Sequence, residues 1–173
     1  MNYIVRLFIF FLISSFFITP AYSQVLPQNL DKMVENPELV KAMDKLATDK
    51  SRQTKLKLAV ELNRANYLVP VKMDKMNASD TNKDGVVNLE KDSGIEVVAM
   101  SDGKGNDYMP VFTDIKSFES WASDDMKTIV LPADKVWKFV LSKSQYYGVV
   151  VNPGAKALPL KKKAIQFLAS RNE

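Results

Sequence analysis

The amino-acid sequence contains no cysteine and no histidine among its 173 residues. Without cysteine the chain forms no disulfide and offers no thiol nucleophile, and without histidine it has neither a Ser-His-Asp triad nor a zinc finger or zincin site. A Ser-Lys mechanism needs neither cysteine nor histidine. However, no S-x-x-K motif lies at the start of a helix that follows an expected core strand. We therefore expect that the protein is not an enzyme.

Glycine is also scarce, with 6 residues, whereas 46% of the residues are hydrophobic and 25% are charged. This balance is typical of a globular domain and excludes a wholly disordered or collagen-like chain. The formal net charge is +4, but aromatic residues do not alternate with the basic ones as a nucleic-acid platform requires. We expect no nucleic-acid partner.

Residues 1–23 have the pattern of a cleaved secretory signal peptide. Arg6 gives a positive charge before a hydrophobic run over 7–18, and Ala21 and Ser23 place small residues at −3 and −1 of a cleavage site. The alternative is an uncleaved membrane anchor, but the run of about 12 residues falls short of the roughly 20 that span a bilayer. We expect a periplasmic or secreted bacterial protein with no stable membrane anchor after cleavage.

The rest of the chain reads as an N-terminal lead-in over 24–35 and a single domain over 36–170. Hydrophobic spacing and turn residues predict helices beginning at 37, 52, 114, 134 and 160, and strands over 67–71, 95–100, 108–112, 128–131 and 147–151. The order ααβββαβαβα predicts an α+β fold, with a mixed β-sheet of about five strands and helices packed on it. On the second helix we expect Leu56, Ala59, Val60 and Leu62 on the buried side.

Three short motifs follow one another along this domain. A Val-Pro strand occupies 67–71, Phe112-Thr113-Asp114 leads from a strand into a helix that ends at Trp121, and Asn152-Pro153-Gly154 follows a late strand. Each motif has a structural interpretation. The aromatic ring fills the core, the hydroxyl and carboxylate cap the next helix, and the amide and glycine close a turn.

In this order and spacing the motifs resemble the N-terminal domain of the SseB (enhanced serine sensitivity) proteins, over about residues 36–169. The resemblance implies a small module of helices and strands without an established catalytic residue set. We therefore expect an exported binding or interaction module with a protein partner in the cell envelope. The oligomeric state is left open.

Residues 80–91 match the start of an EF-hand or dockerin-type calcium loop. The candidate ligands, at loop positions 1, 3, 5, 7 and 9, are Asp80, Asn82, Asp84, the Val86 carbonyl and Asn88. Position 12 holds Lys91 where a bidentate acid is usual, although Glu90 and Asp92 flank it. Two alternatives stay open: a weak calcium site, which would make this a calcium-binding envelope protein, or a solvated insertion between two strands.

Three further groups of residues are candidate sites. A carboxylate pair could be drawn from Asp102, Asp107 and Asp114, but turn and cap roles are expected for all three. The basic tract over 156–163 could attract polyanions or could be a solvated face. Four aromatic residues could line a partner groove: core packing is expected for Trp121 and Tyr147, while Trp137 and Tyr146 are left open.

Overall fold

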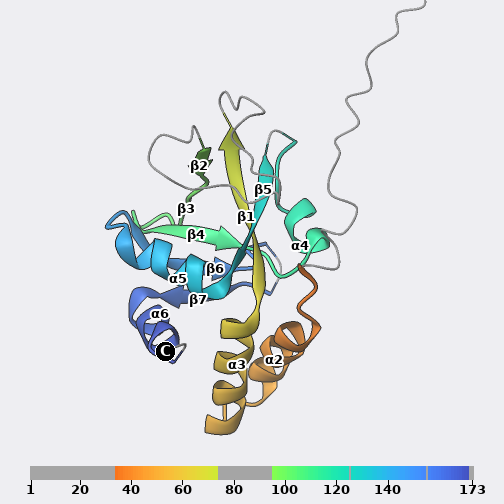
Figure 1. Cartoon of the computed structure of the whole chain (residues 1–173). Coiled ribbons are helices and arrows are strands. Elements are labelled where there is room, and N and C mark those ends of the chain that lie inside the picture. The colour runs from red at the N-terminus through yellow and green to blue at the C-terminus, as the bar shows by residue number, and fades with distance from the viewer. Residues whose placement is uncertain (1–33, 74–94, 125, 155, 172–173) are drawn as a thin grey trace, which may run out of the picture.

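The computed structural model describes residues 34–73, 95–124, 126–154 and 156–171 (Figure 1). Two helices, α2 (Pro37–Thr48) and α3 (Arg52–Arg64), come first and pack against each other. Proline at the first position suits the start of α2, and the Ser51 hydroxyl accepts a hydrogen bond from the Thr54 N–H at the start of α3. These local signals place both helices where the sequence predicts them.

The strands form two sheets. In the first, β1 (Asn66–Met73) lies between β2 (Ile95–Val97) and β5 (Lys127–Pro132), and both pairings are antiparallel. The second has the order β3-β4-β6-β7 and is mixed, because β4 and β6 run parallel. Its strands are β3 (Met100–Ser101), β4 (Asp107–Val111), β6 (Tyr146–Val151) and β7 (Leu158–Lys161).

An isolated bridge between Leu68 and Phe112 joins the two sheets. Each residue's backbone N–H donates to the other's carbonyl, at 3.0 and 2.9 Å. Three more helices follow the strands: α4 (Ile115–Glu119), α5 (Ala133–Ser142) and α6 (Lys162–Ala169). Figure 1 shows α5 and α6 beside the second sheet and α3, while α4 lies at the far end of β4.

The α+β class expected from the sequence is confirmed. The described strands number seven in two sheets, where the sequence predicts about five in one. The expected strand over 95–100 is divided, since Val98 and Ala99 leave the ladder between β2 and β3. The additional strand is β7, whose residues the sequence assigns partly to the C-terminal helix; pairing with β6 holds it extended.

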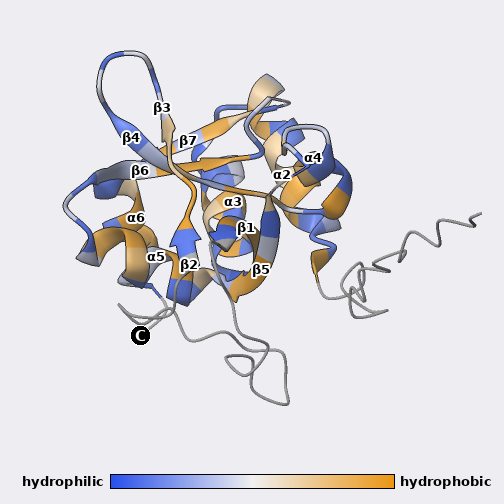
Figure 2. Ribbon diagram, turned by 90° about the horizontal axis from the view of Figure 1, so that it is seen from above, coloured by the Kyte–Doolittle hydropathy of each residue, from blue (hydrophilic) through white to orange (hydrophobic). Residues whose placement is uncertain are grey.

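The main core lies between the sheets and helices α2, α3, α5 and α6. Tyr67 and Trp137 are fully buried at its centre with ring centroids 5.7 Å apart. Both satisfy their polar atoms: the Tyr67 hydroxyl donates to the Leu62 carbonyl, and the Trp137 Nε1–H donates to Asn63 Oδ1. Burial also raises the pKa of the Tyr67 hydroxyl. In Figure 2, hydrophobic and hydrophilic residues alternate along the covering helices α5 and α6.

No helix in the described ranges is both long enough and apolar enough to cross a membrane.

Candidate interaction surface

The Phe112-Thr113-Asp114 and Asn152-Pro153-Gly154 motifs meet at one end of the second sheet. They follow the carboxyl ends of β4 and β6, which are parallel neighbours with Val111 paired to Val151. The backbone N–H of Thr113 donates to Asn152 Oδ1 at 2.9 Å, and Asn152 Nδ2 donates to the Thr113 hydroxyl at 2.8 Å. Ligands often bind where parallel strands end. Whether this junction can bind a ligand depends on whether its polar groups already have hydrogen-bond partners within the protein.

The polar groups of the junction are engaged by the protein itself. Asp114 caps α4 by accepting from the Ser117 N–H at 2.7 Å and also accepts from the Thr113 hydroxyl at 2.7 Å. Partial burial acts to raise the pKa of Asp114, but these hydrogen bonds, that of the Ser117 hydroxyl and the nearby Lys116 outweigh it, so the pKa lies below its usual value.

Asn36 completes the same junction from the start of α2. Asn36 occupies the N-cap position, where asparagine is common, but its side chain forms no capping hydrogen bond with α2. Instead Asn36 Nδ2 lies 2.8 Å from each of three backbone carbonyls, those of Val34, Asn66 and Thr113. Across the described residues no buried side-chain nitrogen or oxygen lacks a partner. The motifs therefore act as structural devices, as their residue types indicate.

The candidate calcium ligands Asp80, Asn82, Asp84, Val86 and Asn88 lie outside the described residues. The strand ends on either side are described: Met73 of β1 pairs with Ile95 of β2, so the segment joins two antiparallel neighbours. Within the ranges that the structure describes, no group of three acidic, histidine or cysteine side chains could hold a metal ion.

Of the three carboxylates that could form a catalytic pair, Asp102 and Asp107 lie in the same hairpin, where Asp107 pairs with Ser101, and Asp114 lies apart from both. Asp107 begins β4 and Asp114 follows its end, so the strand separates them by more than about 15 Å. Asp102 is exposed in the β3–β4 hairpin, where it accepts from the Asn106 amide at 2.8 Å. This bond and those of the Lys104 and Asn106 N–H groups hold the pKa of Asp102 below its usual value.

Most of the basic tract over 156–163 has partners within the fold. Lys156 forms an ion pair with Asp44, Lys161 lies over the Tyr147 ring, and Lys162 Nζ donates to the Lys143 carbonyl. The tract spans β7 and the start of α6 and so does not form one continuous basic helix face.

The four candidate aromatics divide by burial. Trp137 and Tyr146 are core residues, and Trp121 is half-buried against Phe112. The expectation that Tyr147 packs in the core is wrong, because the residue is 40% exposed. Successive residues of a strand face opposite sides, and Tyr146 takes the inner side.

Exposed apolar side chains gather instead on α3 and α6. Leu56 and Val60 of α3 are 37% and 42% exposed, and Phe167 of α6 is 50% exposed. The expectation that Leu56 and Val60 are buried is wrong, because α3 turns Leu58 and Leu62 toward the core. Leu56 and Val60 are four residues apart and therefore share one face of α3. Because apolar residues occur on more than one face of this helix, the sequence does not indicate which face is buried.

A hollow of about 250 Å³ lies between these helices, lined by Ala59, Val60, Asn63, Arg64 and Arg171. Asn63 Nδ2 donates to the Leu168 carbonyl and so holds α3 against α6. The Arg171 guanidinium lies over the Phe167 ring, 4.7 Å from its centroid. We use the name α3–α6 surface for this hollow together with the exposed residues at intervals of four along each helix: Arg52, Leu56, Val60 and Arg64 of α3, with Lys163, Phe167 and Arg171.

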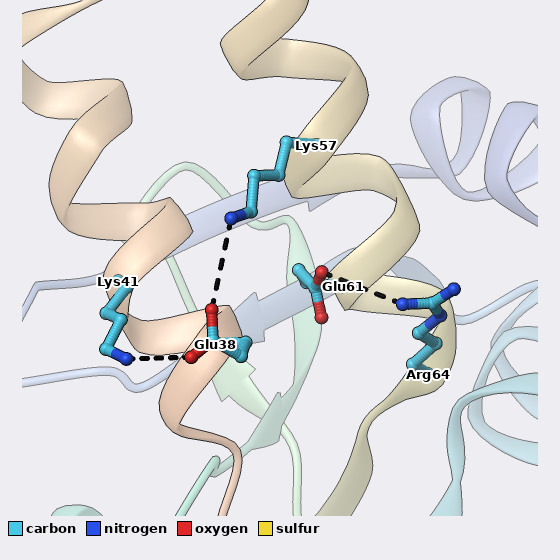
Figure 3. Close-up of polar contacts among 5 residues, drawn as sticks. All are labelled: Glu38, Lys41, Lys57, Glu61 and Arg64. Atoms are coloured by element: carbon cyan, nitrogen blue, oxygen red, sulfur yellow. Dashed lines mark hydrogen bonds and ion pairs between the residues drawn. The ribbon is translucent and has the colours of Figure 1, made fainter.

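Ion pairs occupy the neighbouring side of α3, where it meets α2 (Figure 3). Glu38 lies 2.7 Å from Lys41 Nζ and 3.9 Å from Lys57 Nζ. The hydrogen bond from Lys41, with the charges of both lysines, holds the pKa of Glu38 below its usual value. Glu61 contacts Arg64 at 4.0 Å. Such exposed ion pairs add little to the free energy of unfolding. Their main effect is that acidic and basic charges balance on this side of α3.

The fold and this surface define a small α+β module whose motif residues serve the structure and whose helices expose an apolar and basic face. The SseB protein N-terminal domain model matches residues 39–166, which is most of the chain. The chain therefore belongs to the SseB N-terminal domain family, and the resemblance noted in the sequence is confirmed. No curated protein and no solved structure gives a significant match.

Proposed function

We propose that this protein is an exported, non-catalytic interaction module that binds a protein partner in the cell envelope through the α3–α6 surface. The observation that carries the proposal is the exposure of Val60 in the wall of the hollow, with exposed Leu56 one turn before it on α3 and exposed Phe167 one turn before the lining residue Arg171. Apolar side chains grouped beside a hollow and rimmed by polar groups are typical of interaction sites. The signal-like pattern of residues 1–23 supports export, and the engaged junction of β4 and β6 supports a role without catalysis.

Site-specific photo-crosslinking in intact cells tests this function. A photoreactive phenylalanine analogue placed at Val60 or Phe167 is expected to give a covalent adduct with one defined protein of the envelope fraction. The same analogue at Lys116, an exposed position on α4, is the matched control and should give no such adduct. Equal labelling from all three positions, or none from Val60 and Phe167, would contradict the proposal.

The alternative function, a calcium-binding envelope protein, is supported by the sequence pattern at 80–91. If the loop binds the ion only in the folded state, calcium at 100 times its dissociation constant adds about 2.7 kcal/mol to the free energy of unfolding. The unfolding midpoint should then rise by several degrees in millimolar calcium relative to EDTA or magnesium. Asp84→Ala should abolish the rise. Superimposable melting curves in all three conditions would rule this alternative out.

A further inference from the structure

The basic residues of the α3–α6 surface are mostly arginines, which are rare in this chain. Of the 24 basic residues, four are arginines, and one of these, Arg6, lies in the signal-like segment. The other three, Arg52, Arg64 and Arg171, all belong to the α3–α6 surface, where Lys163 accompanies them, while the basic residues elsewhere in the described ranges are lysines. Arginine is enriched and lysine depleted at protein interfaces, because the planar guanidinium pairs with carboxylates through two parallel hydrogen bonds.

These arginines alternate with apolar side chains. Along α3, Arg52, Leu56, Val60 and Arg64 follow one another at intervals of four residues, which forms an oblique ridge on a helix. Along α6 and just past it, Lys163, Phe167 and Arg171 repeat the same interval. Both rows therefore place apolar side chains between cations, and the hollow is lined by Val60 and Arg64 of the first row and by Arg171 of the second.

Carboxylates scarcely oppose these cations. Glu61 is the acidic partner near the rows, and its side chain is only 15% exposed, whereas that of Arg64 is 75% exposed. Arg171 stacks on Phe167, which leaves the edge of its guanidinium open to hydrogen bonding. Within the described part of the chain, Arg52, Lys163 and Arg171 form no ion pair with a carboxylate.

We infer that the α3–α6 surface binds an acidic, amphipathic segment of a partner protein. An apolar side chain of the segment enters the hollow beside Val60, and carboxylates on its flanks pair with Arg64 and Arg171. This inference rests on the proposed function and specifies the chemistry of the partner. A protein segment fits better than a lipid surface, because a single side chain can fill a concave hollow and because arginine replaces the lysine that is otherwise common in this chain.

Binding of synthetic helical peptides to the protein purified from exporting cells tests the inference by fluorescence anisotropy. The first peptide carries leucines on one face and glutamates elsewhere. The second has lysine in place of each glutamate, and the third has the composition of the first with its leucines dispersed. The first is expected to bind at least tenfold more tightly than the other two. Equal binding of the first and third, or no binding of the first, would overturn the inference.

Variants locate the binding on the surface. Arg64→Glu combined with Arg171→Glu should weaken the first peptide at least tenfold and should favour the second. Arg64→Lys with Arg171→Lys keeps the charge and should weaken the first peptide severalfold, because the paired hydrogen bonds are lost. Lys104→Glu with Lys116→Glu makes the same charge change at two other exposed positions and should alter binding less than twofold. If this control loses as much affinity for the first peptide, the effect is due to net charge alone and the inference is overturned.

The two proposals can fail separately. Phosphatidylglycerol vesicles that bind the protein while the first peptide does not would assign the surface to lipid and refute the acidic segment. Crosslinks from Val60 and Phe167 to an envelope protein, without binding of the first peptide, would retain the interaction module and refute the partner's acidic chemistry. If neither position gives a crosslink and the first peptide does not bind, both proposals are refuted.

Discussion

Replacing Gly148 with alanine should lower the free energy of unfolding by about 3 kcal/mol, the upper part of the usual range for overpacking a core. Gly148 lies in β6 opposite Lys161 of β7. A Cβ atom there would overlap the Leu160 carbonyl oxygen and lie 3.0 Å from both the Leu160 carbonyl carbon and Lys161 Cα. All three atoms are backbone, so no side-chain rotation relieves the contact. β7 must move, and α6 moves with it because the helix begins directly after the strand.

Chemical denaturation followed by circular dichroism measures this loss. Gly103→Asn is the matched control, because Gly103 has a φ of +74° that asparagine tolerates and no atom lies within 4 Å of a Cβ there. We expect the control to lose no more than about 1 kcal/mol, because asparagine adopts the left-handed conformation at less cost than other residues with a side chain. If Gly148→Ala unfolds at the same denaturant concentration as the control, the close approach of β6 and β7 does not constrain the fold.

Asn152→Ala should cost about 3 kcal/mol, for two separate reasons. The side chain forms both hydrogen bonds to Thr113 across the junction, and a buried donor left without a partner costs about 1–3 kcal/mol. Asn152 also has a φ of +50°, a left-handed conformation that costs alanine about 1–2 kcal/mol. The largest share of the loss belongs to the N–H of Thr113, which is fully buried and donates its hydrogen bond to Asn152 Oδ1.

Asn152→Gly separates the two contributions. Glycine adopts the left-handed backbone freely but supplies no hydrogen bond, so this variant should be destabilised by about 1 kcal/mol less than Asn152→Ala. Urea unfolding of both variants beside the parent gives the comparison. Identical stability of the two variants would show that the backbone conformation contributes nothing. Parental stability of both would show that the bridge between β4 and β6 is dispensable.

Local structure could be predicted well from the sequence. Proline after Asn36, the serine before α3 and the aspartate before α4 are start signals that act within one helical turn. The hairpin over 101–107 and the turn after β6 likewise depend on neighbouring residues. The ordered motifs also indicated the SseB N-terminal domain family, which the family model confirms.

Features that depend on distant partners could not be predicted in the same way. β7 is a short segment with prolyl and lysyl residues, and only the ladder with β6 makes it a strand. Strand alternation requires Tyr146 and Tyr147 to face opposite sides, but the packing of Phe139 against Tyr146 decides which one is inside. The direction in which Asn36 turns its amide likewise depends on Thr113, which lies 77 positions along the chain.

The α3–α6 surface shows the same division between sequence and tertiary structure. The sequence by itself determined that α3 is a helix, that cations and apolar residues alternate along it, and that arginine is rare in the chain. It could not determine which face of α3 is covered, because apolar residues occur at 56, 58, 59, 60 and 62 and so surround more than one face. Only the packing of α2, α5 and α6 against α3 buried Leu58 and Leu62 and left Val60 exposed. The physical reason is that helix formation is governed by contacts within one turn, whereas burial is governed by whichever distant segment packs against the helix.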